Sequence, residues 1–385
     1  MMPRKGSGFR IITMALLCLA MALQWVHTVQ GDDRYRTAAT TRKGEKWRIG
    51  YYQGGPYINY PANLTAIARG LAELGWMSPF KVPPEAAPSD AKVIWMALAR
   101  TQSAYLRFVP DAFYSAEWND DRRVQTRQAA IARLQARQLD FIIAMGTWAG
   151  QDLANHLHSI PTMVVSSSDP VKSGIVKSAD RSGFDHVHAR CVPNRYLKQV
   201  RLFHDIVGFK RLGIVYEDTA AGRSYAGLSD IERVAAQRGF KLITCEAPWS
   251  GVSRQVSTEK MVACHKALAP RIDALFMTVH QGVDNDHMNE ILAPLMEYKI
   301  PTWSQRGPQE VRRGVLLSVS RGDFKAVGRY HARIMAKILN GAHPGSLSQV
   351  FEDPKKIAIN LKTAKAIGFD APRGLLKAAD EIFKE

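Results

Sequence analysis

The amino-acid sequence predicts an α/β fold made of two doubly wound parallel-sheet lobes with a ligand cleft between them. Short apolar runs alternate with amphipathic stretches of helical periodicity, which is the pattern of strands joined by crossover helices. Most runs are apolar on both faces, as strands covered by helices on both sides must be. The chain has 385 residues, which suits two sheets better than one. Such sheets bind ligands beyond the carboxyl ends of their strands, so two facing sheets would enclose a cleft.

Residues 1–31 are predicted to be a signal peptide. Basic residues precede an apolar stretch over 11–23, which is shorter than the roughly 20 residues that a membrane-spanning helix needs. Val29 and Gly31 supply small residues before a cleavage site at Asp32. An uncleaved anchor is the alternative interpretation. We therefore expect a soluble periplasmic protein.

Strands are expected in seven runs of the remaining chain. They are Trp47–Tyr52, Phe141–Met145, Thr162–Val165, Arg211–Tyr216, Leu242–Cys245, Ala274–Val279 and Val315–Val319. Apolar periodicity predicts a helix over 64–74 that stops at Gly75, and another over 327–338 that ends before Asn340. The stretch 87–101 is interpreted as an extra helix before the next strand.

Composition and charge argue against nucleic acid as a partner. The formal net charge is +17, but the basic side chains recur along the whole chain without a run of five or six. Hydrophobic residues make up 46% and charged residues 23%, which is the balance of a folded globular protein.

Motifs for covalent chemistry are missing from the sequence. There is no GxxxxGK[ST] or GxSxG pattern, and the segment 145–150 lacks the spacing of GxGxxG. The histidine pairs His156/His158 and His186/His188 have no clustered carboxylate or cysteine to complete a metal site. We therefore expect no enzyme activity, no cofactor and no metal.

Three cysteines remain after removal of the signal peptide. Cys245 ends a predicted strand and Cys264 lies on the following helical stretch, so a local disulfide between them is as plausible as two thiols. Cys191 would be left over.

Polar and aromatic residues follow the predicted strands, at the edges that should face the cleft. Hydroxyls and amides suit a carboxylate, acids suit an ammonium group, and large rings such as Tyr57 and Trp148 suit an apolar or planar ligand. Helix capping is the alternative role for each small polar residue. The candidate binding residues are Gln53, Tyr57, Thr147, Trp148, Ser167, Ser168, Asp169, Glu217, Arg223, His280, Gln281 and Gln305.

The chain resembles a known family in several segments. The strongest match is Ile160-Pro161 followed by Ser168-Asp169-Pro170-Val171 and Gly174-Ile175-Val176-Lys177-Ser178. Further matches are Arg211–Tyr216, the region 318–341 and the ending from Ile357 through Asn360-Leu361-Lys362-Thr363-Ala364-Lys365-Ala366-Ile367-Gly368. Over about residues 46–385 it is similar to the ABC transporter substrate-binding proteins of the tryptophan/tyrosine type, with the type I periplasmic binding protein fold.

The resemblance implies an architecture, a role and one further binding residue. It implies three crossings between the lobes, with lobe 1 over 46–187 plus 324–343 and lobe 2 over 188–323 plus 344–385. It places Asp323 at the third crossing, where its carboxylate would meet a bound ammonium group. It also implies a monomer that captures a small molecule, with an aromatic amino acid expected, for an ABC permease in the inner membrane.

Two features keep the ligand and the role open at this point. Trp148 stands where the family has small residues, and Ser304-Gln305-Arg306-Gly307-Pro308 replaces a more acidic loop near the ligand. The alternative role is a periplasmic sensing subunit that presents its closed form to a membrane receptor.

Overall fold

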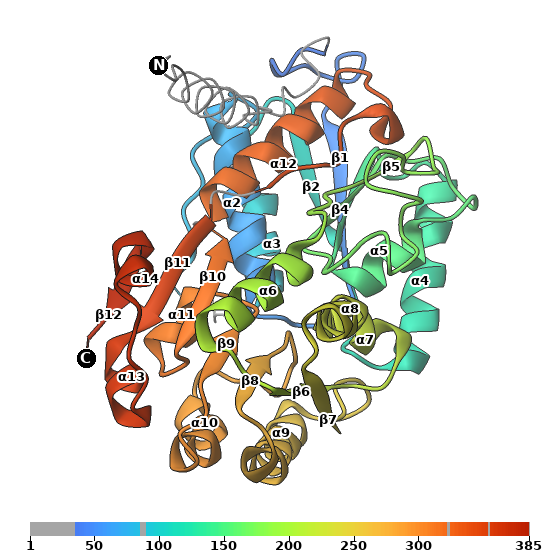
Figure 1. Ribbon diagram of the computed structural model, residues 1–385. Helices are drawn as coiled ribbons and strands as arrows, with labels where there is room; N and C mark the ends of the chain where they lie inside the picture. The colour runs from blue at the N-terminus through green and yellow to red at the C-terminus, as the bar shows by residue number, and fades with distance from the viewer. Residues whose placement is uncertain (1–34, 85–89, 322–323, 353–354, 385) are drawn as a thin grey trace, which may run out of the picture. The chain divides into compact units, whose positions relative to one another are not determined.

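Two sheets organise the part of the chain that the computed structural model describes, which is residues 35–84, 90–321, 324–352 and 355–384 (Figure 1). The signal peptide predicted over 1–31 lies outside these residues. The first sheet has the order β2-β1-β3-β4-β5, and all its neighbours are parallel. Its strands are β1 (Trp47–Gln53), β2 (Leu106–Ser115), β3 (Phe141–Met145), β4 (Thr162–Val165) and β5 (Val187–Ala189).

The second sheet has the order β12-β11-β10-β9-β8-β6-β7. Its strands are parallel to their neighbours except at the pair β10 and β11, which is antiparallel. They are β6 (Arg211–Tyr216), β7 (Lys241–Glu246), β8 (Ala274–Met277), β9 (Thr302–Ser304), β10 (Leu317–Arg321), β11 (Lys355–Asn360) and β12 (Glu381–Phe383). The predicted parallel sheets are therefore confirmed, with one antiparallel pair at β10 and β11.

Helices cover both faces of each sheet, and each sheet with its helices is called a lobe below. The first lobe holds α2 (Asn59–Glu73), α3 (Ala91–Arg100) and α12 (Phe324–Leu339) against one face, with α4 (Asp120–Gln135) and α5 (Thr147–Leu153) against the other. The second lobe holds α6 (Arg195–Val207), α7 (Ala220–Ala226), α8 (Leu228–Arg238), α9 (Arg254–Leu268), α10 (Met288–Glu297), α11 (Pro308–Arg312), α13 (Leu361–Ile367) and α14 (Arg373–Ala378). Single 3₁₀ turns lie at Ala269–Arg271 and Pro344–Ser346. The predicted α/β class with two lobes is confirmed.

The extra helix is α3, and its first turn has a side-chain cap. Asp90 Oδ1 accepts hydrogen bonds from the backbone N–H groups of Lys92 and Val93, at 2.9 and 3.1 Å. Such a cap satisfies donors that a helix start otherwise leaves without a partner.

The chain passes between the lobes more than once. Helix α12 follows β10 of the second sheet but packs on α2 of the first lobe (Figure 1). Gly328 allows this close approach, because a Cβ there would lie 2.5 Å from atoms of Ala66. The segment after β5 and the segment before β11 run side by side, since the Cys191 backbone N–H donates to the Gln349 carbonyl and the Cys191 carbonyl accepts from the Phe351 N–H.

Candidate ligand-binding site

The candidate site is formed by loops that follow the strands of both sheets. The strand order reverses at β1/β3 in the first sheet and at β6/β8 in the second. Open α/β sheets bind ligands at such reversal points, beyond the carboxyl ends of the strands. Side chains from these loops and from those after β2, β7 and β9 contact one another across the lobes.

Five rings from the two lobes form one aromatic cluster. Trp249 lies at its centre, with its ring centroid 6.1 Å from Tyr57, 5.6 Å from Trp118 and 4.6 Å from Tyr225. Trp118 in turn lies 5.4 Å from Trp148. Trp249 belongs to the second lobe, yet it is only 3% exposed and packs within the hydrophobic core of the first. The aromatic cluster therefore joins the lobes.

Two buried hydrogen-bonding groups of this cluster lack a partner among the described residues. They are the indole Nε1–H of Trp249 and the hydroxyl of Tyr225. Most buried polar groups in proteins have a partner, and leaving one without costs about 1–3 kcal/mol. A small molecule that placed an acceptor oxygen at either group would recover this energy.

Two glycines after β1 make room for the rings of the first lobe. A Cβ on Gly55 would lie 2.5 Å from the Trp118 ring, and one on Gly54 would lie 2.9 Å from Trp148. Trp118 has a left-handed backbone with φ 54°, which is unusual for a bulky residue and is typical of functional sites. Its N–H donates to the Gly54 carbonyl, and its own carbonyl accepts from Gly251 of the second lobe.

Glu217 holds the loop that carries Trp249. Its Oε1 accepts from the backbone N–H groups of Trp249 and Ser250, at 2.9 and 2.7 Å, and from the Ser250 hydroxyl at 2.6 Å. Its Oε2 accepts from Thr219. Burial opposes ionisation of Glu217, but the hydrogen bonds from Ser250 and the Trp249 backbone outweigh it and lower the pKa. Glu217 is therefore a carboxylate whose acceptor capacity is used by its own loop.

His280 and Gln281 support the same loop from the end of β8. His280 Nε2 lies 3.0 Å from the Ala247 carbonyl, and its Nδ1 accepts from the Gly282 N–H. Burial lowers the pKa of His280 to about 4, so the ring is neutral. Gln281 donates to the Trp249 carbonyl at 3.0 Å.

A disulfide closes the segment that contains Trp249. Cys245, at the end of β7, is bonded to Cys264 on α9, with an S–S distance of 2.01 Å. The disulfide that the sequence left open is thus formed, while Cys191 is a buried thiol. The cross-link restricts the Trp249 loop together with the hydrogen bonds from Glu217.

The remaining buried candidates are hydrogen-bonded to neighbouring protein groups. Gln53 accepts from the Tyr51 hydroxyl at 2.8 Å, and the hydroxyls of Thr147 and Ser167 lie 3.3 Å apart. Gln305 accepts from the Val279 N–H and donates to the carbonyls of Tyr225 and Ala226. These residues fix the loops on which the rings stand.

Trp148 is buried against a cation. The guanidinium carbon of Arg123 lies 4.4 Å from the centroid of the Trp148 ring, within the range of a cation–π contact. Asp152 holds that guanidinium through hydrogen bonds of 3.0 and 3.1 Å. Arg123 thus covers one face of the Trp148 ring.

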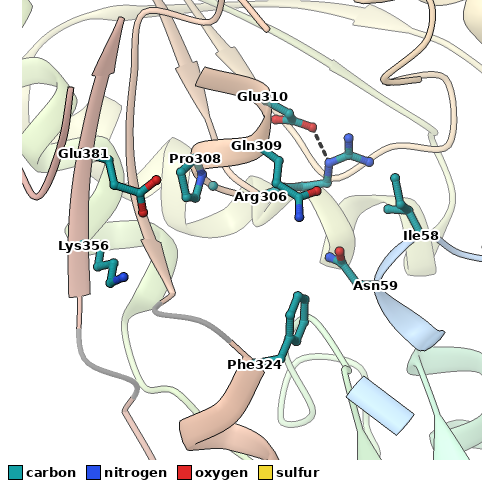
Figure 2. A pocket seen from close by; sticks show the side chains of 10 residues that line it. Ile58, Asn59, Arg306, Pro308, Gln309, Glu310, Phe324, Lys356 and Glu381 are labelled. Carbon is teal, nitrogen blue, oxygen red and sulfur yellow. Dashed lines mark hydrogen bonds and ion pairs between the residues drawn. The ribbon is translucent and has the colours of Figure 1, made fainter. Parts of the chain in front are cut away.

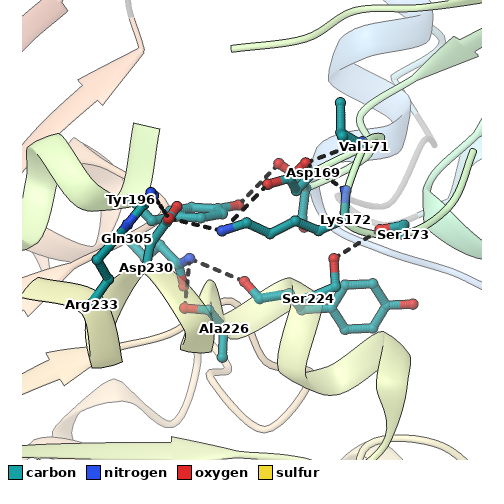
Figure 3. Close-up of polar contacts among 12 residues, drawn as sticks. Asp169, Val171, Lys172, Ser173, Tyr196, Ser224, Ala226, Asp230, Arg233 and Gln305 are labelled. Carbon is teal, nitrogen blue, oxygen red and sulfur yellow. Dashed lines mark hydrogen bonds and ion pairs between the residues drawn. The ribbon is translucent and has the colours of Figure 1, made fainter. Parts of the chain in front are cut away.

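Ser168 and Asp169 lie in a turn at the lobe interface (Figure 3). Asp169 Oδ1 accepts from the N–H groups of Val171 and Lys172, so it caps this turn. The Ser168 carbonyl accepts from the Tyr196 hydroxyl of α6 at 3.3 Å.

The same turn makes a polar bridge to the second lobe, called here the interlobe latch. Its residues are Lys172 and Ser173 of the first lobe and Ser224 and Asp230 of the second. Lys172 Nζ lies 2.8 Å from Asp230 Oδ1, and the hydroxyls of Ser173 and Ser224 lie 2.8 Å apart (Figure 3). Asp230 is 5% exposed and is also paired with Arg233.

One described candidate residue lies apart from this group. Arg223 is exposed and paired with Asp218 at 2.6 Å on the surface of the second lobe. Asp323 lies outside the described residues.

Next to the aromatic cluster is a charged pocket with a volume of about 260 Å³ (Figure 2). This is smaller than the roughly 300–1,000 Å³ of pockets for drug-sized ligands, so it suits a small metabolite. Arg306 borders it and has a side-chain hydrogen bond with Tyr57 of the aromatic cluster. The lining residues are Ile58, Asn59, Arg306, Gly307, Pro308, Gln309, Glu310, Phe324, Lys356 and Glu381.

The sequence analysis missed Trp118, Trp249 and Arg306 as candidates. Trp118 follows β2, a strand that was not expected because Pro110 interrupts its apolar run. Trp249 stands three residues beyond the end of β7, and Arg306 follows Gln305 directly. The rule that selects residues after strands would have found both if it had been applied to longer loops.

Comparison with known proteins agrees with this architecture. The family model described as ABC transporter substrate binding protein matches residues 115–383, which is more than half of the chain. This chain belongs to that family of substrate-binding proteins.

Similar proteins include one curated relative and several solved structures. The Tyrosine-binding protein of Clostridioides difficile (strain R20291) is 23% identical over 251 residues, covering 65% of this chain and 69% of the relative. A conserved domain protein from Vibrio cholerae has a TM-score of 0.65 at 20% identity, covering 88% of this chain and 100% of that one. An ABC domain from Streptococcus pneumoniae, solved in complex with L-Trp, has a TM-score of 0.64 at 19% identity, covering 87% and 100%.

Membrane-spanning helices and clusters of metal-ligating side chains are both absent from the described part of this substrate-binding protein. No helix within it combines the length and apolarity needed to cross a membrane. It likewise contains no group of three or more His, Cys, Asp or Glu side chains placed to hold a metal ion.

Proposed function

We propose that this substrate-binding protein captures an aromatic amino acid in the periplasm and delivers it to an ABC importer in the inner membrane. The observation that carries the proposal is the aromatic cluster, in which rings of both lobes surround two buried donors without a partner among the described residues. The tyrosine and tryptophan named for the C. difficile and S. pneumoniae proteins support the choice of ligand class.

The site would work by closure of the lobes on the ligand. Tyr57, Trp118 and Trp148 of the first lobe and Trp249 of the second would cover the aromatic ring. A ligand that touches both walls only when the lobes meet stabilises the closed state, and it does so by the difference in its affinity for the two states. The boundaries that go with this proposal are 46–187 plus 324–343 for lobe 1 and 188–323 plus 344–385 for lobe 2.

The predicted binding residues fall into two roles under this proposal. The rings of Tyr57 and Trp148 contribute to the aromatic wall, whereas Gln53, Thr147, Ser167, Glu217, His280, Gln281 and Gln305 hold the loops. Ser168 and Asp169 shape the turn that carries the latch.

The proposed location rests on the signal peptide predicted over 1–31. The Cys245–Cys264 disulfide supports it, because structural disulfides persist in oxidising compartments such as the periplasm.

A thermal-shift screen of the purified protein against the twenty L-amino acids tests the ligand class. Tyrosine or tryptophan should raise the melting temperature, because a ligand at about 100 times its Kd adds about 2.7 kcal/mol to the free energy of unfolding. Calorimetry then gives the affinity. A screen in which neither aromatic amino acid raises the melting temperature, while another ligand does, would replace the proposed substrate.

Delivery to an importer needs a separate experiment. Cells that lack this protein should lose uptake of the radiolabelled amino acid at low external concentration and regain it when the gene is restored. Unchanged uptake would remove the transport role.

A further inference from the structure

Arg306 is a buried cation at the junction of the aromatic cluster and the charged pocket. It follows β9, and its side chain is 9% exposed. Its Nε donates to Glu310 Oε1, and Glu310, itself 1% exposed, accepts from the Ser304 hydroxyl through its other oxygen. Glu310 therefore fixes the direction of the guanidinium.

The guanidinium keeps donors for a ligand after these contacts. Arginine has five N–H donors in a planar fork. The Nε–H donates to Glu310, a further hydrogen bond joins the side chain to Tyr57, and Arg306 is one of the residues that line the pocket (Figure 2). Burial lowers the pKa of Arg306, but Glu310 and Tyr57 raise the pKa by more than burial lowers it, so the side chain stays charged.

The surroundings of the pocket also favour a negative group. Helix α2 begins at its wall, and no side chain caps that helix start at Ile58. The first turn of α2 contains no acidic residue. A helix of this length presents a partial positive charge and backbone N–H groups at its start, which favour an anion. Lys356 and Glu381 add one further cation and one further acid to the lining, so the preference for an anion rests on the helix start and on Arg306.

Apolar side chains complete the pocket next to these charges. Ile58, Pro308 and Phe324 line it, and Tyr57 connects Arg306 with Trp249 of the aromatic cluster. A ligand with a carboxylate at Arg306 would thus have apolar walls and aromatic rings within reach of its side chain.

We propose that Arg306 binds the α-carboxylate of the amino-acid ligand and that Glu310 is the residue that positions it. This inference rests on the proposed function, which assigns an aromatic amino acid to the same site. Bidentate pairing of a guanidinium with a carboxylate is geometrically specific, so Arg306 distinguishes an amino acid from the corresponding amine.

The experiment compares ligands with and without the carboxylate. Calorimetry is carried out with L-tryptophan and L-tyrosine, and with tryptamine and tyramine, which keep the ring and the ammonium group. The unchanged protein should bind the amino acids about ten- to a hundredfold more tightly than the amines, as expected for one charged hydrogen-bonded contact. Arg306→Gln should weaken amino-acid binding by that factor and leave amine binding unchanged.

Two further variants separate binding from folding. Arg306→Gln leaves Glu310 without its cation, so the double variant Arg306→Gln/Glu310→Gln removes both charges together and should keep the melting temperature closer to that of the unchanged protein. Arg306→Lys keeps the charge without the fork and should restore part of the preference for the carboxylate.

The outcomes distinguish this inference from the proposed function. If neither amino acid binds the unchanged protein, the aromatic amino acid as substrate is wrong, and the role of Arg306 is wrong with it. If the amino acids bind but a folded Arg306→Gln or double variant still prefers them over the amines, only the role of Arg306 is overturned.

Discussion

The two lobes contribute different chemistry to the site, although their loops occupy equivalent positions after parallel strands. The loops of the first lobe present the rings of Tyr57, Trp118 and Trp148, for which Gly54 and Gly55 leave space. The loops of the second lobe present polar groups, most of which are already hydrogen-bonded to protein.

The polar groups of the second lobe mainly orient one ring. Glu217, His280 and Gln281 all bond to the segment from Ala247 to Ser250, and so they place Trp249 among the rings of the first lobe. A polar side chain after a strand is therefore weak evidence for ligand contact until its hydrogen bonds have been counted. Arg306 differs from the others because it keeps donors toward a pocket.

The most direct way to break this comparison is to remove Trp249, the central ring of the cluster and one of the two that the second lobe contributes. Trp249→Ala should weaken binding of the aromatic amino acid by about thirtyfold or more, because buried rings at the centre of a binding surface contribute about 2 kcal/mol or more. Trp249→Phe keeps a ring but lacks the indole N–H, so it should lose less affinity. Calorimetry measures both, and equal affinity of Trp249→Ala and the unchanged protein would remove Trp249 from the site.

Removal of the disulfide tests how much the covalent closure of the Trp249 loop contributes to stability. Cys245→Ser/Cys264→Ser should lower the free energy of unfolding by about 3 kcal/mol, the size expected for a closed loop of this length. Urea denaturation measures the loss. Cys191→Ser is the matched control, because Cys191 is a buried thiol outside the cross-link; an equal loss in both variants would contradict the prediction.

The neutral histidines predict how stability depends on pH. Burial lowers the pKa of His158, His188, His265 and His280 to about 4, against about 6.5 in an unfolded chain. Between these values the unfolded chain binds protons that the folded chain does not. The free energy of unfolding should therefore fall as pH drops from about 6.5 towards 4, by up to about 3 kcal/mol for each histidine.

His280→Gln tests whether His280 is a buried neutral histidine that contributes to this pH dependence. Between pH 4 and 7, the free energy of unfolding of this variant should depend less steeply on pH, because about one proton fewer is taken up on unfolding. The exposed His156→Gln is the control and should leave the slope unchanged. A slope that stays the same in His280→Gln would contradict the assigned role.

The interlobe latch should have the smallest effect, because Lys172 is 34% exposed and solvent screens its pair with Asp230. Lys172→Met should weaken ligand binding by about two- to fivefold, corresponding to an exposed pair of up to about 1 kcal/mol, and less so at high salt. Arg223→Met removes an exposed pair within one lobe and should leave affinity unchanged. Equal affinity of Lys172→Met and Arg223→Met for the ligand would contradict the prediction.

The sequence predicted the fold well wherever apolar runs were continuous. The expected strands Phe141–Met145, Thr162–Val165 and Arg211–Tyr216 have the same bounds as β3, β4 and β6. Strand β2 was missed because Pro110 breaks its pattern, and β11 because its run is short and flanked by lysines. The antiparallel direction of β11 depends on where the chain returns to the sheet, and the local sequence pattern carries no information about that return.

Prediction of the site was limited by the same kind of missing information. Residue type and position after a strand located the loops, and they identified Tyr57 and Trp148. They did not distinguish Glu217, whose oxygens are used within its own loop, from a carboxylate open to a ligand. That distinction depends on contacts with Trp249 and Ser250, more than thirty residues away, which only the folded chain brings together.

The packing of α12 on α2 has a consequence for the time at which the first lobe can form. The ion pair between Glu73 of α2 and Arg329 of α12 joins residues separated by 256 positions. During synthesis, α2 emerges long before α12 exists, so the side of α2 on which α12 packs stays uncovered until nearly the whole chain has appeared. Contacts this distant also carry a large loop-closure entropy and slow folding. The order of assembly therefore keeps the nascent first lobe loose, the condition in which a chain can still be threaded through a narrow channel or be bound by a chaperone.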